Sequence, residues 1–225
     1  MSTRGGRQRI PRPPTARAGA PPPWARLAPA DRTFTLAQVR ERCARLAPPR
    51  PPQLVVPGSR AAAVLMTLFE ENGEARVVLT KRPEHMPSHR GEIAFPGGTV
   101  QPDVDHTVLD AALREAEEEI GLSRGAVEVA AELDGISTVA SRFTITPFVG
   151  LLDQRPTLVP DPREVEAILD VGLAELLDDG VYREERWDIG LPDRAIHFFE
   201  LPGETVWGAT ARILFSFLDH LVADR

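Results

Sequence analysis

Apolar and polar positions divide most of the chain into short strands and a few helices. The first clear signal is a continuous apolar run over 61–69, which has the length and composition of a buried strand. A polar turn at 70–74 follows, and 75–80 is a second run of the same kind. Two strands joined by so short a turn predict a β-hairpin.

Further strand-like runs and helical segments follow the hairpin. The last helical segment, at about 208–222, carries its apolar residues at helical spacing. The other predicted strands cover 127–133, 145–152 and 195–201, and the other predicted helices cover 107–121 and 173–178. Strands and helices do not alternate regularly, so the pattern predicts an α/β (α+β) fold with a mixed sheet sandwiched by helices, not a doubly wound sheet.

The N-terminal part is built differently. Eleven of the 22 prolines lie within the first 52 residues, and this Pro/Arg-rich composition predicts a disordered arm over 1–28. Apolar residues recur at helical spacing within 35–46, and Thr33 or Thr35 can cap the start, which predicts a short docking helix. Cys43 lies on its apolar stripe, which favours a small buried hydrophobe over a nucleophile. The predicted units are an arm (1–28), a docking helix with a Pro-rich linker (29–52) and a main domain (53–225).

Charge is distributed unevenly, with a net value of −7. Residues 1–50 carry eleven Arg against Asp31 and Glu41, whereas 51–225 carries fifteen basic and thirty-one acidic residues. An acidic body repels nucleic acid and favours divalent cations, so a nucleic-acid partner is not expected. The single cysteine and the lack of an apolar run long enough for a signal or a membrane span predict a soluble cytoplasmic protein with no membrane partner.

The most informative chemistry lies in the predicted helix 107–121. Glu115, Glu118 and Glu119 are spaced three and four residues apart, so their carboxylates project from one patch of that helix. Bare carboxylates repel one another, and hard divalent cations, which take oxygen ligands, explain such a cluster economically. The alternative is a solvated acidic face with Arg114 paired to Glu118.

The same string resembles a known motif. The nine residues R-E-A-E-E-E-I-G-L, which begin at Arg114, match the last nine positions of the Nudix box, G-x5-E-x7-R-E-U-x-E-E-x-G-U with U apolar. The front half departs from it: Gly98 precedes Arg114 by sixteen residues instead of fourteen, and His106 stands where the box has Glu. With a two-residue insertion, either Asp103 or Asp105 substitutes for that acid, and His106 is interpreted as a solvated loop residue.

The residues that flank the box resemble one branch of the Nudix hydrolases in particular. Residues 79–98 are similar to the signature L-L-T-x-R-[S/A]-x3-R-x3-G-x3-F-P-G-G of the coenzyme A diphosphatase branch of the Nudix hydrolases, and V-W-G-A-T-A-R-I-L near the C-terminus is similar to that branch's last helix entry. Pro83 stands where Ser or Ala is usual, and Pro87 where Arg is usual. Arg90 or His89 is the candidate to replace the missing cation.

The resemblance implies a Nudix-type α/β/α sandwich over 53–225 that uses Mg²⁺ or Mn²⁺ to hydrolyse a nucleoside diphosphate-linked substrate. The predicted substrate is coenzyme A or its thioesters, cleaved to 3′,5′-ADP and 4′-phosphopantetheine. The enzymatic alternative is ADP-ribose, a nucleotide sugar or a nucleoside triphosphate. An alternative of another class is a non-catalytic Nudix domain that senses a nucleotide or binds a partner. The expected partner is a small nucleotide, and a homodimer is compatible with the resemblance.

The resemblance also assigns roles within the box. Glu115 and Glu119 are the predicted metal ligands, and Glu118 is a third ligand or the acceptor of the proton from the attacking water. Arg114 has the supporting role of the family, because its guanidinium can hold a neighbouring carboxylate in place.

Outside the box, Glu164 is the predicted general base, with Glu166 behind it. Arg82 is a candidate phosphate ligand. Trp207 stacks on adenine or, in the alternative, packs in the core. Gly97 and Gly98 are predicted to form a positive-φ turn that brings the loop onto the helix and to line the substrate site.

Overall fold

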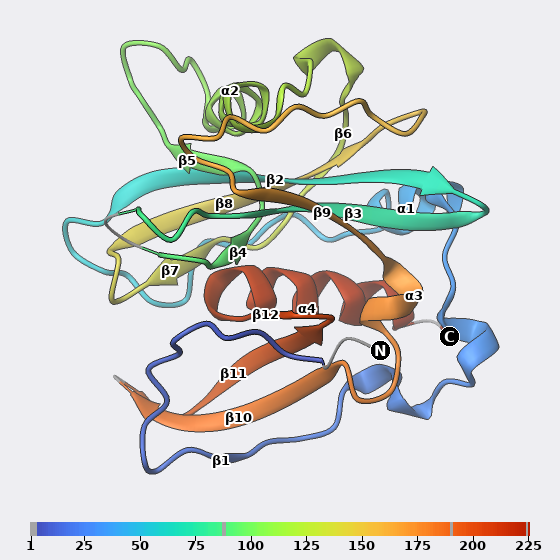
Figure 1. Cartoon of the computed structure of the whole chain (residues 1–225), viewed down its shortest axis with the longest axis vertical. Helices are drawn as coiled ribbons and strands as arrows, with labels where there is room; N and C mark the ends of the chain where they lie inside the picture. The colour runs from blue at the N-terminus through green and yellow to red at the C-terminus, as the bar shows by residue number, and fades with distance from the viewer. Residues whose placement is uncertain (1–3, 87–88, 190, 224) are drawn as a thin grey trace.

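The computed structural model describes residues 4–86, 89–189, 191–223 and 225. These residues form stacked layers (Figure 1): α2 covers one face of a large sheet, and α4 lies between the opposite face and a smaller sheet. The α-helices of this part of the chain are α1 (Leu36–Cys43), α2 (Val108–Ile120), α3 (Leu173–Leu176) and α4 (Gly208–Val222), and its 3-10 helices are Pro23–Arg26, Pro29–Arg32 and Arg124–Ala126. The predicted fold class is confirmed, since helices cover both faces of a mixed sheet.

The large sheet is built around the predicted hairpin. Strands β2 (Arg60–Glu71) and β3 (Glu74–Lys81) pair antiparallel, and Asn72 and Gly73 between them both have positive φ, as a tight hairpin turn requires. Strand β8 (Phe143–Leu151) runs parallel to β2, which makes the sheet mixed. The other strands of this sheet are β4 (Ile93–Ala94), β5 (Gly97–Thr99), β6 (Glu128–Glu132), β7 (Ile136–Thr138) and β9 (Ala167–Gly172).

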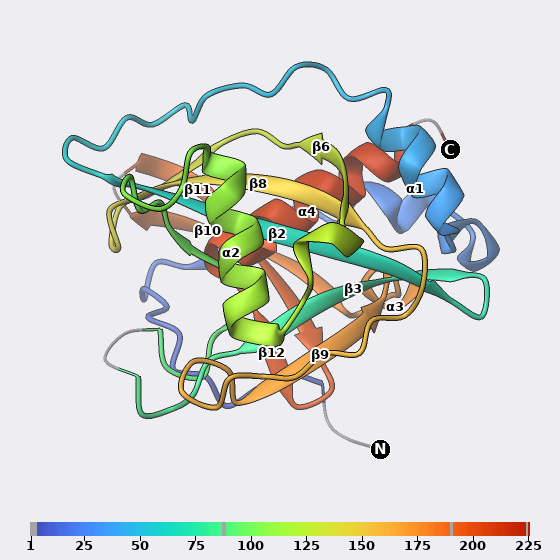
Figure 2. The same cartoon turned by 90° about the horizontal axis from the view of Figure 1, so that it is seen from above.

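Helix α2 lies close to the large sheet because the residues that face the sheet have small side chains. Ala111, Ala112 and Ala116 are fully buried there, and Ile120 fills the end of the same stripe. Seen from above, α2 crosses over β2 near the middle of the sheet (Figure 2). The helix that carries the acidic string is therefore fixed in position by apolar contacts along one face.

The smaller sheet was only partly expected from the sequence. Its order is β1 (Arg17–Ala18), β10 (Tyr182–Ile189), β11 (Leu191–Leu201) and β12 (Glu204–Val206), and all its pairs are antiparallel. Sequence patterning predicts part of β11 and none of β10, because β10 consists mostly of charged residues. Those charges pair with each other and with β11, as in Arg186–Glu184 at 2.7 Å and Arg183–Glu200 at 2.7 Å.

The N-terminal arm differs most from the sequence-based expectation of disorder over 1–28. In the structure, residues 4–28 lie against the smaller sheet: β1 pairs with β10, and Gly5 N–H donates to Leu201 O at 2.9 Å. Trp24 is only 1% exposed and stacks near Phe199. Arg12 and Arg17 of the arm pair with acidic residues of β10, and Trp24 supplies the apolar contact, so the arm shares a core with the main domain.

The predicted docking helix is α1. Thr35, not Thr33, is its N-cap, and its side chain and that of Gln38 form a reciprocal capping box. Cys43 is buried in the core as predicted, and burial raises the pKa of its thiol to about 11, which suits a packing role and not a nucleophile.

Candidate metal and active site

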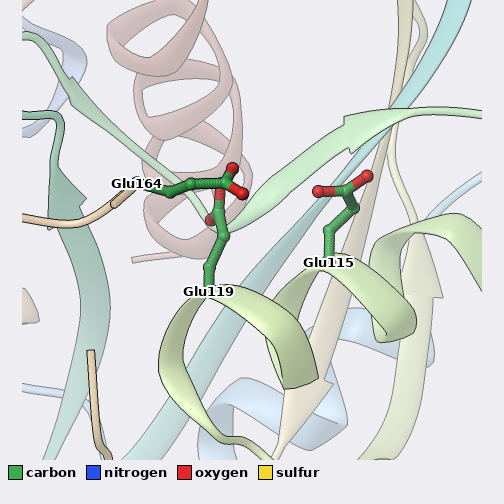
Figure 3. A group of neighbouring side chains, drawn as sticks. All are labelled: Glu115, Glu119 and Glu164. Carbon is green, nitrogen blue, oxygen red and sulfur yellow. The ribbon is translucent and has the colours of Figure 1, made fainter. Parts of the chain in front are cut away.

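The site begins with the placement of α2 beside β5. Thr107 caps the helix in a capping box with Asp110, and Gly121 ends it in the left-handed conformation at φ +68°. Glu115 and Glu119 are one turn apart on this helix, and both face β5 and the loops beyond it (Figure 3). Regular helix geometry therefore brings two carboxylates together, as the spacing predicts.

Two glycines of β5 make room for this approach. A Cβ atom at Gly98 would collide with the Glu115 carboxylate, and one at Gly97 would collide with the Ala63 backbone of β2. The pair does not form the positive-φ turn predicted from the sequence: both residues lie in strand β5, and Gly97 alone of the two has positive φ, at +157°. Their glycine identity is required by close packing between the strand, β2 and the helix.

A third carboxylate comes from a distant segment. Glu164 lies in the loop between β8 and β9, and its oxygen joins those of Glu115 and Glu119 in a group whose ligand atoms all lie within 4.8 Å of one another. Figure 3 shows the Glu164 side chain reaching over Glu119 from that loop. The loop is held to the end of α2, where Asp161 N–H donates to Glu119 O at 2.8 Å. The structure thus brings together three of the predicted site residues.

Burial makes this group electrostatically unfavourable without a cation. Burial raises the pKa of Glu119 to about 8; the Gly97 N–H and Arg82 oppose the increase, and the Glu115 and Glu164 carboxylates add to it. Burial likewise raises the pKa of Glu115, although Arg114 partly offsets that effect. Three carboxylate oxygens this close together, two of them on side chains whose pKa burial raises, are a donor set that suits hard divalent cations such as Mg²⁺ and Mn²⁺.

Arg114 is buried and holds the base of the site. Its Nε and Nη2 donate to the two Asp105 oxygens at 3.0 Å each, and its Nη1 donates to Glu115 at 2.7 Å. The alternative left open by the sequence is thereby decided: Asp105 is buried against Arg114, whereas Asp103 is exposed. His106 is exposed, as the sequence analysis expects.

Glu118 stands apart from the carboxylate group. Its carboxylate accepts from Arg114 Nη1 at 3.1 Å, and its side chain is 59% exposed. This Arg114–Glu118 contact is the one that the alternative of a solvated acidic helix face predicts. The role of Glu118 as a ligand or proton acceptor stays a prediction.

Arg82 is the cation beside the buried carboxylate. Its Nη1 lies 3.9 Å from Glu119 Oε1, and its Nε is buried with no hydrogen-bond partner among the described residues. A partly exposed guanidinium with one buried, unused donor can bind an anionic oxygen. This geometry supports the predicted phosphate contact of Arg82.

The remaining candidates lie farther from this chemistry. Pro87 lies outside the described residues. Arg90 Nε donates to Met86 O at 2.7 Å and His89 pairs with Glu92 at 2.8 Å, so both make local contacts within the loop. Trp207 is half-buried directly before α4, where it is neither fully exposed nor part of the core.

Comparison with known proteins decides the family. A family model described as the NUDIX domain matches residues 59–188, which include the glycine pair, α2 and Glu164. The chain belongs to the Nudix hydrolase family. It is 32% identical over 166 residues to the uncharacterized Nudix hydrolase NudL of Photorhabdus laumondii, a match that covers 74% of this chain and 87% of that protein.

Two further comparisons agree with this assignment. The chain is 40% identical over 163 residues to the chloroplastic Nudix hydrolase 22 of Arabidopsis thaliana, which covers 69% of this chain and 53% of the relative, so the chain spans about half the length of that plant protein. The MutT/nudix family protein from Enterococcus faecalis shares the fold with a TM-score of 0.51 at 17% identity, over 89% of this chain and 72% of that one. In the part of the chain that the structure describes, no helix has the length and apolarity needed to cross a bilayer.

Proposed function

We propose that this Nudix domain hydrolyses coenzyme A or its thioesters to 3′,5′-ADP and a 4′-phosphopantetheine product, with Mg²⁺ or Mn²⁺ as cofactor. The observation that carries the metal-dependent part is the group formed by Glu115, Glu119 and Glu164. The resemblance of residues 79–98 to the coenzyme A diphosphatase signature supports the choice of substrate.

Glu115 and Glu119, with Glu164, are the residues that would hold the cation. A bound divalent cation supplies charge neutralisation at phosphate oxygens and lowers the pKa of coordinated water. The buried carboxylate of Glu119 and the unused Arg82 Nε beside it fit such a site, since each is costly to bury without a partner.

The chain's own residues have separate tasks in this reaction. Water attacks one phosphorus of the diphosphate, a new P–O bond forms, and the anhydride P–O bond breaks. Glu164, whose side chain is exposed, would offer one carboxylate oxygen to the cation and accept the proton of the attacking water on the other, and Arg82 would stabilise the charge that develops on the phosphate oxygens. Arg114 fixes the Glu115 carboxylate, so that the ligand keeps its orientation through the reaction.

Two alternatives keep the same fold but differ in outcome. ADP-ribose, a nucleotide sugar or a nucleoside triphosphate would use the same carboxylates and Arg82. A non-catalytic Nudix domain would bind a nucleotide or a protein without cleaving it. The cytoplasm as compartment and the homodimer as oligomeric state stay predictions, and light scattering after size-exclusion chromatography measures the latter.

Product analysis against a substrate panel tests the proposal. The full chain is incubated with Mg²⁺ or Mn²⁺ and coenzyme A, acetyl-coenzyme A, 3′-dephospho-coenzyme A, ADP-ribose, a nucleotide sugar or a nucleoside triphosphate, and products are identified by mass spectrometry. We expect the highest kcat/KM for coenzyme A or its thioester, with 3′,5′-ADP as one product.

Glu119→Gln is the control for a contaminating activity, because it keeps the side-chain shape and removes the charge. Faster cleavage of ADP-ribose or of another panel member would replace coenzyme A as the substrate. No cleavage of any diphosphate with either cation would favour the non-catalytic alternative.

A further inference from the structure

Lys81 is the only lysine in a chain whose other basic side chains, histidine aside, are all arginine. It ends strand β3 and directly precedes Arg82. Its ammonium lies 2.8 Å from Glu204 Oε1 and 3.1 Å from Glu166 Oε1, and its side chain is 21% exposed. One partly buried cation therefore bridges a carboxylate of β12 in the smaller sheet and one in the loop directly before β9 of the large sheet.

On one side, Lys81 holds the segment that carries Glu164. Glu166 N–H donates to Lys81 O at 2.8 Å, in addition to the side-chain ion pair. Val165, between the two glutamates, is 2% exposed and packs in the core under α2. Since Asp161 is tied to the end of α2, Lys81 fixes the other end of the short loop from which Glu164 projects.

On the other side, Lys81 is joined to the N-terminal arm. Glu204 of β12 also accepts from Gln8 Nε2 at 2.7 Å, and Gln8 Oε1 accepts from Thr205 N–H at 3.2 Å. Gly6 N–H donates to Thr205 Oγ1 at 2.8 Å, which keeps this part of the arm along β12. A continuous series of contacts thus runs from Gln8 through Glu204 and Lys81 to Glu166.

We infer that Lys81, supported by Glu204 and Gln8, is a positioning residue that holds Glu164 against Glu115 and Glu119, so that the N-terminal arm contributes to the geometry of the metal site. This inference rests on the metal site of the proposed function and adds the residues that maintain it. Lys81 touches neither the carboxylate group nor the reacting atoms.

The choice of lysine is consistent with this role. An ammonium is compact and directs its three donors at separate acceptors, whereas a guanidinium is planar and longer and favours one bidentate partner. Two carboxylates that approach one point, one from β12 and one from the loop before β9, suit the compact cation. We therefore expect Lys81→Arg to retain the positive charge but to restore the contacts with Glu166 and Glu204 only in part.

Cation affinity separates positioning from simple electrostatics. Removing a positive charge near three carboxylates raises their attraction for a divalent cation, so electrostatics alone predicts tighter Mn²⁺ binding in Lys81→Met. Loss of positioning predicts the opposite, because Glu164 no longer stays beside Glu119. Losses of about tenfold in affinity are typical when a residue that orients a metal ligand is removed.

The experiment is a Mn²⁺ titration of the full chain by calorimetry or electron paramagnetic resonance. We expect Lys81→Met to weaken Mn²⁺ binding by about tenfold, Lys81→Arg to restore part of it, and Gln8→Ala, which changes no charge, to weaken it by about twofold. Arg124→Gln is the matched control: it removes an exposed cation paired with Glu117 on the outer side of α2, and should not weaken binding.

Unchanged or tighter Mn²⁺ binding in Lys81→Met would overturn the inference. So would a loss of Mn²⁺ affinity in Arg124→Gln as large as the loss in Lys81→Met. If Lys81→Met does not fold, as judged by its thermal melt, the neutral Gln8→Ala decides: full wild-type affinity overturns the inference. Wild-type protein that binds Mn²⁺ but cleaves no diphosphate would refute the proposed function alone. Wild-type protein that binds no Mn²⁺ would refute both.

Discussion

Charged residues are arranged in opposite ways in the N-terminal arm and on α2. In the arm, Arg4 meets Asp178 at 2.7 Å, Arg17 meets Asp193 at 2.7 Å, and the side chains of both pairs are about half-exposed. On α2, Glu119 is 4% exposed among other carboxylates, and the Arg82 guanidinium lies 3.9 Å away. Exposed, matched pairs add little stability, whereas buried, unmatched carboxylates cost stability and are kept for function. We therefore expect the apolar contacts of the arm to stabilise the fold, and the charged residues of α2 to serve the chemistry of the site.

The largest expected effect concerns the apolar contact of the arm. Trp24→Ala should lower the free energy of unfolding by about 3–5 kcal/mol, because it removes a fully buried indole that packs on Tyr182 and Phe199. Deleting residues 1–28 should cost at least as much, contrary to the sequence-based expectation that the arm contributes little. Denaturant unfolding followed by fluorescence measures both changes.

The matched control in the arm is Arg17→Gln, whose ion pairs with Asp188 and Asp193 are exposed. Its midpoint of unfolding should be indistinguishable from that of the wild type. A larger loss in Arg17→Gln than in Trp24→Ala would reverse the comparison, because surface charges would then hold the arm.

The next effect concerns catalysis on α2. Glu119→Gln should lower kcat by at least about a hundredfold while the metal-free protein stays folded, because an amide keeps the shape but loses the charge that holds the cation. Glu117→Gln is the control, since Glu117 lies on the same helix but is exposed. Equal turnover in the two variants would refute the metal-site assignment.

Local patterning predicts the elements whose apolar residues are continuous or evenly spaced. The β2–β3 hairpin, α2 and α4 belong to this class, because their burial follows directly from period two or period 3.6. Strand β10 and the arm escape prediction because their stabilising partners are distant in the sequence: the arginines of the arm meet acidic residues more than 170 positions away. Composition alone cannot show that a Pro/Arg-rich segment has a complementary surface.

The residues of the site also separate into those that local spacing predicts and those that depend on distant contacts. Helical spacing is enough to bring Glu115 and Glu119 together, and the resemblance to the Nudix box gives the role of Arg114. The choice between Asp103 and Asp105 depends on how the loop before α2 folds, which spacing does not determine. The contacts of Lys81 depend on two sheets meeting, so its role was not predicted; the sequence signal that could have singled it out is that it is the only lysine.

A smaller effect, on the free energy of unfolding, is expected at Asp105, whose carboxylate is fully paired with Arg114. Asp105→Asn should destabilise the protein by roughly 1.5–3 kcal/mol, since it weakens two charge-assisted hydrogen bonds to the buried Arg114. Asp103→Asn, in the same loop but exposed, should leave unfolding unchanged. If both variants unfold like the wild type, the support of Arg114 by Asp105 is not needed for stability.

The smallest expected effect, taken per unit of pH, is the change in cation binding with pH. With no cation bound, burial raises the pKa of Glu119 to about 8, so at neutral pH most Glu119 carries a proton that an incoming cation must displace. The apparent affinity for Mn²⁺ should fall by about tenfold for each unit of pH below 8 and level off above it. Titrations at pH 6, 7, 8 and 9 measure this slope, and binding that does not vary over this range would show that Glu119 is already ionised.

The same pKa fixes the direction of the stability change without metal. A carboxyl whose pKa is higher in the folded than in the unfolded state stabilises the fold fully below its unfolded pKa, near 4.5, and loses that contribution as the pH rises toward 8. Between pH 5 and pH 8 the metal-free wild type should therefore lose stability relative to Glu119→Gln, which has no proton to release. Saturating Mn²⁺ should reverse the loss in the wild type only, because the cation replaces the proton on the buried Glu119 carboxylate, which the variant lacks.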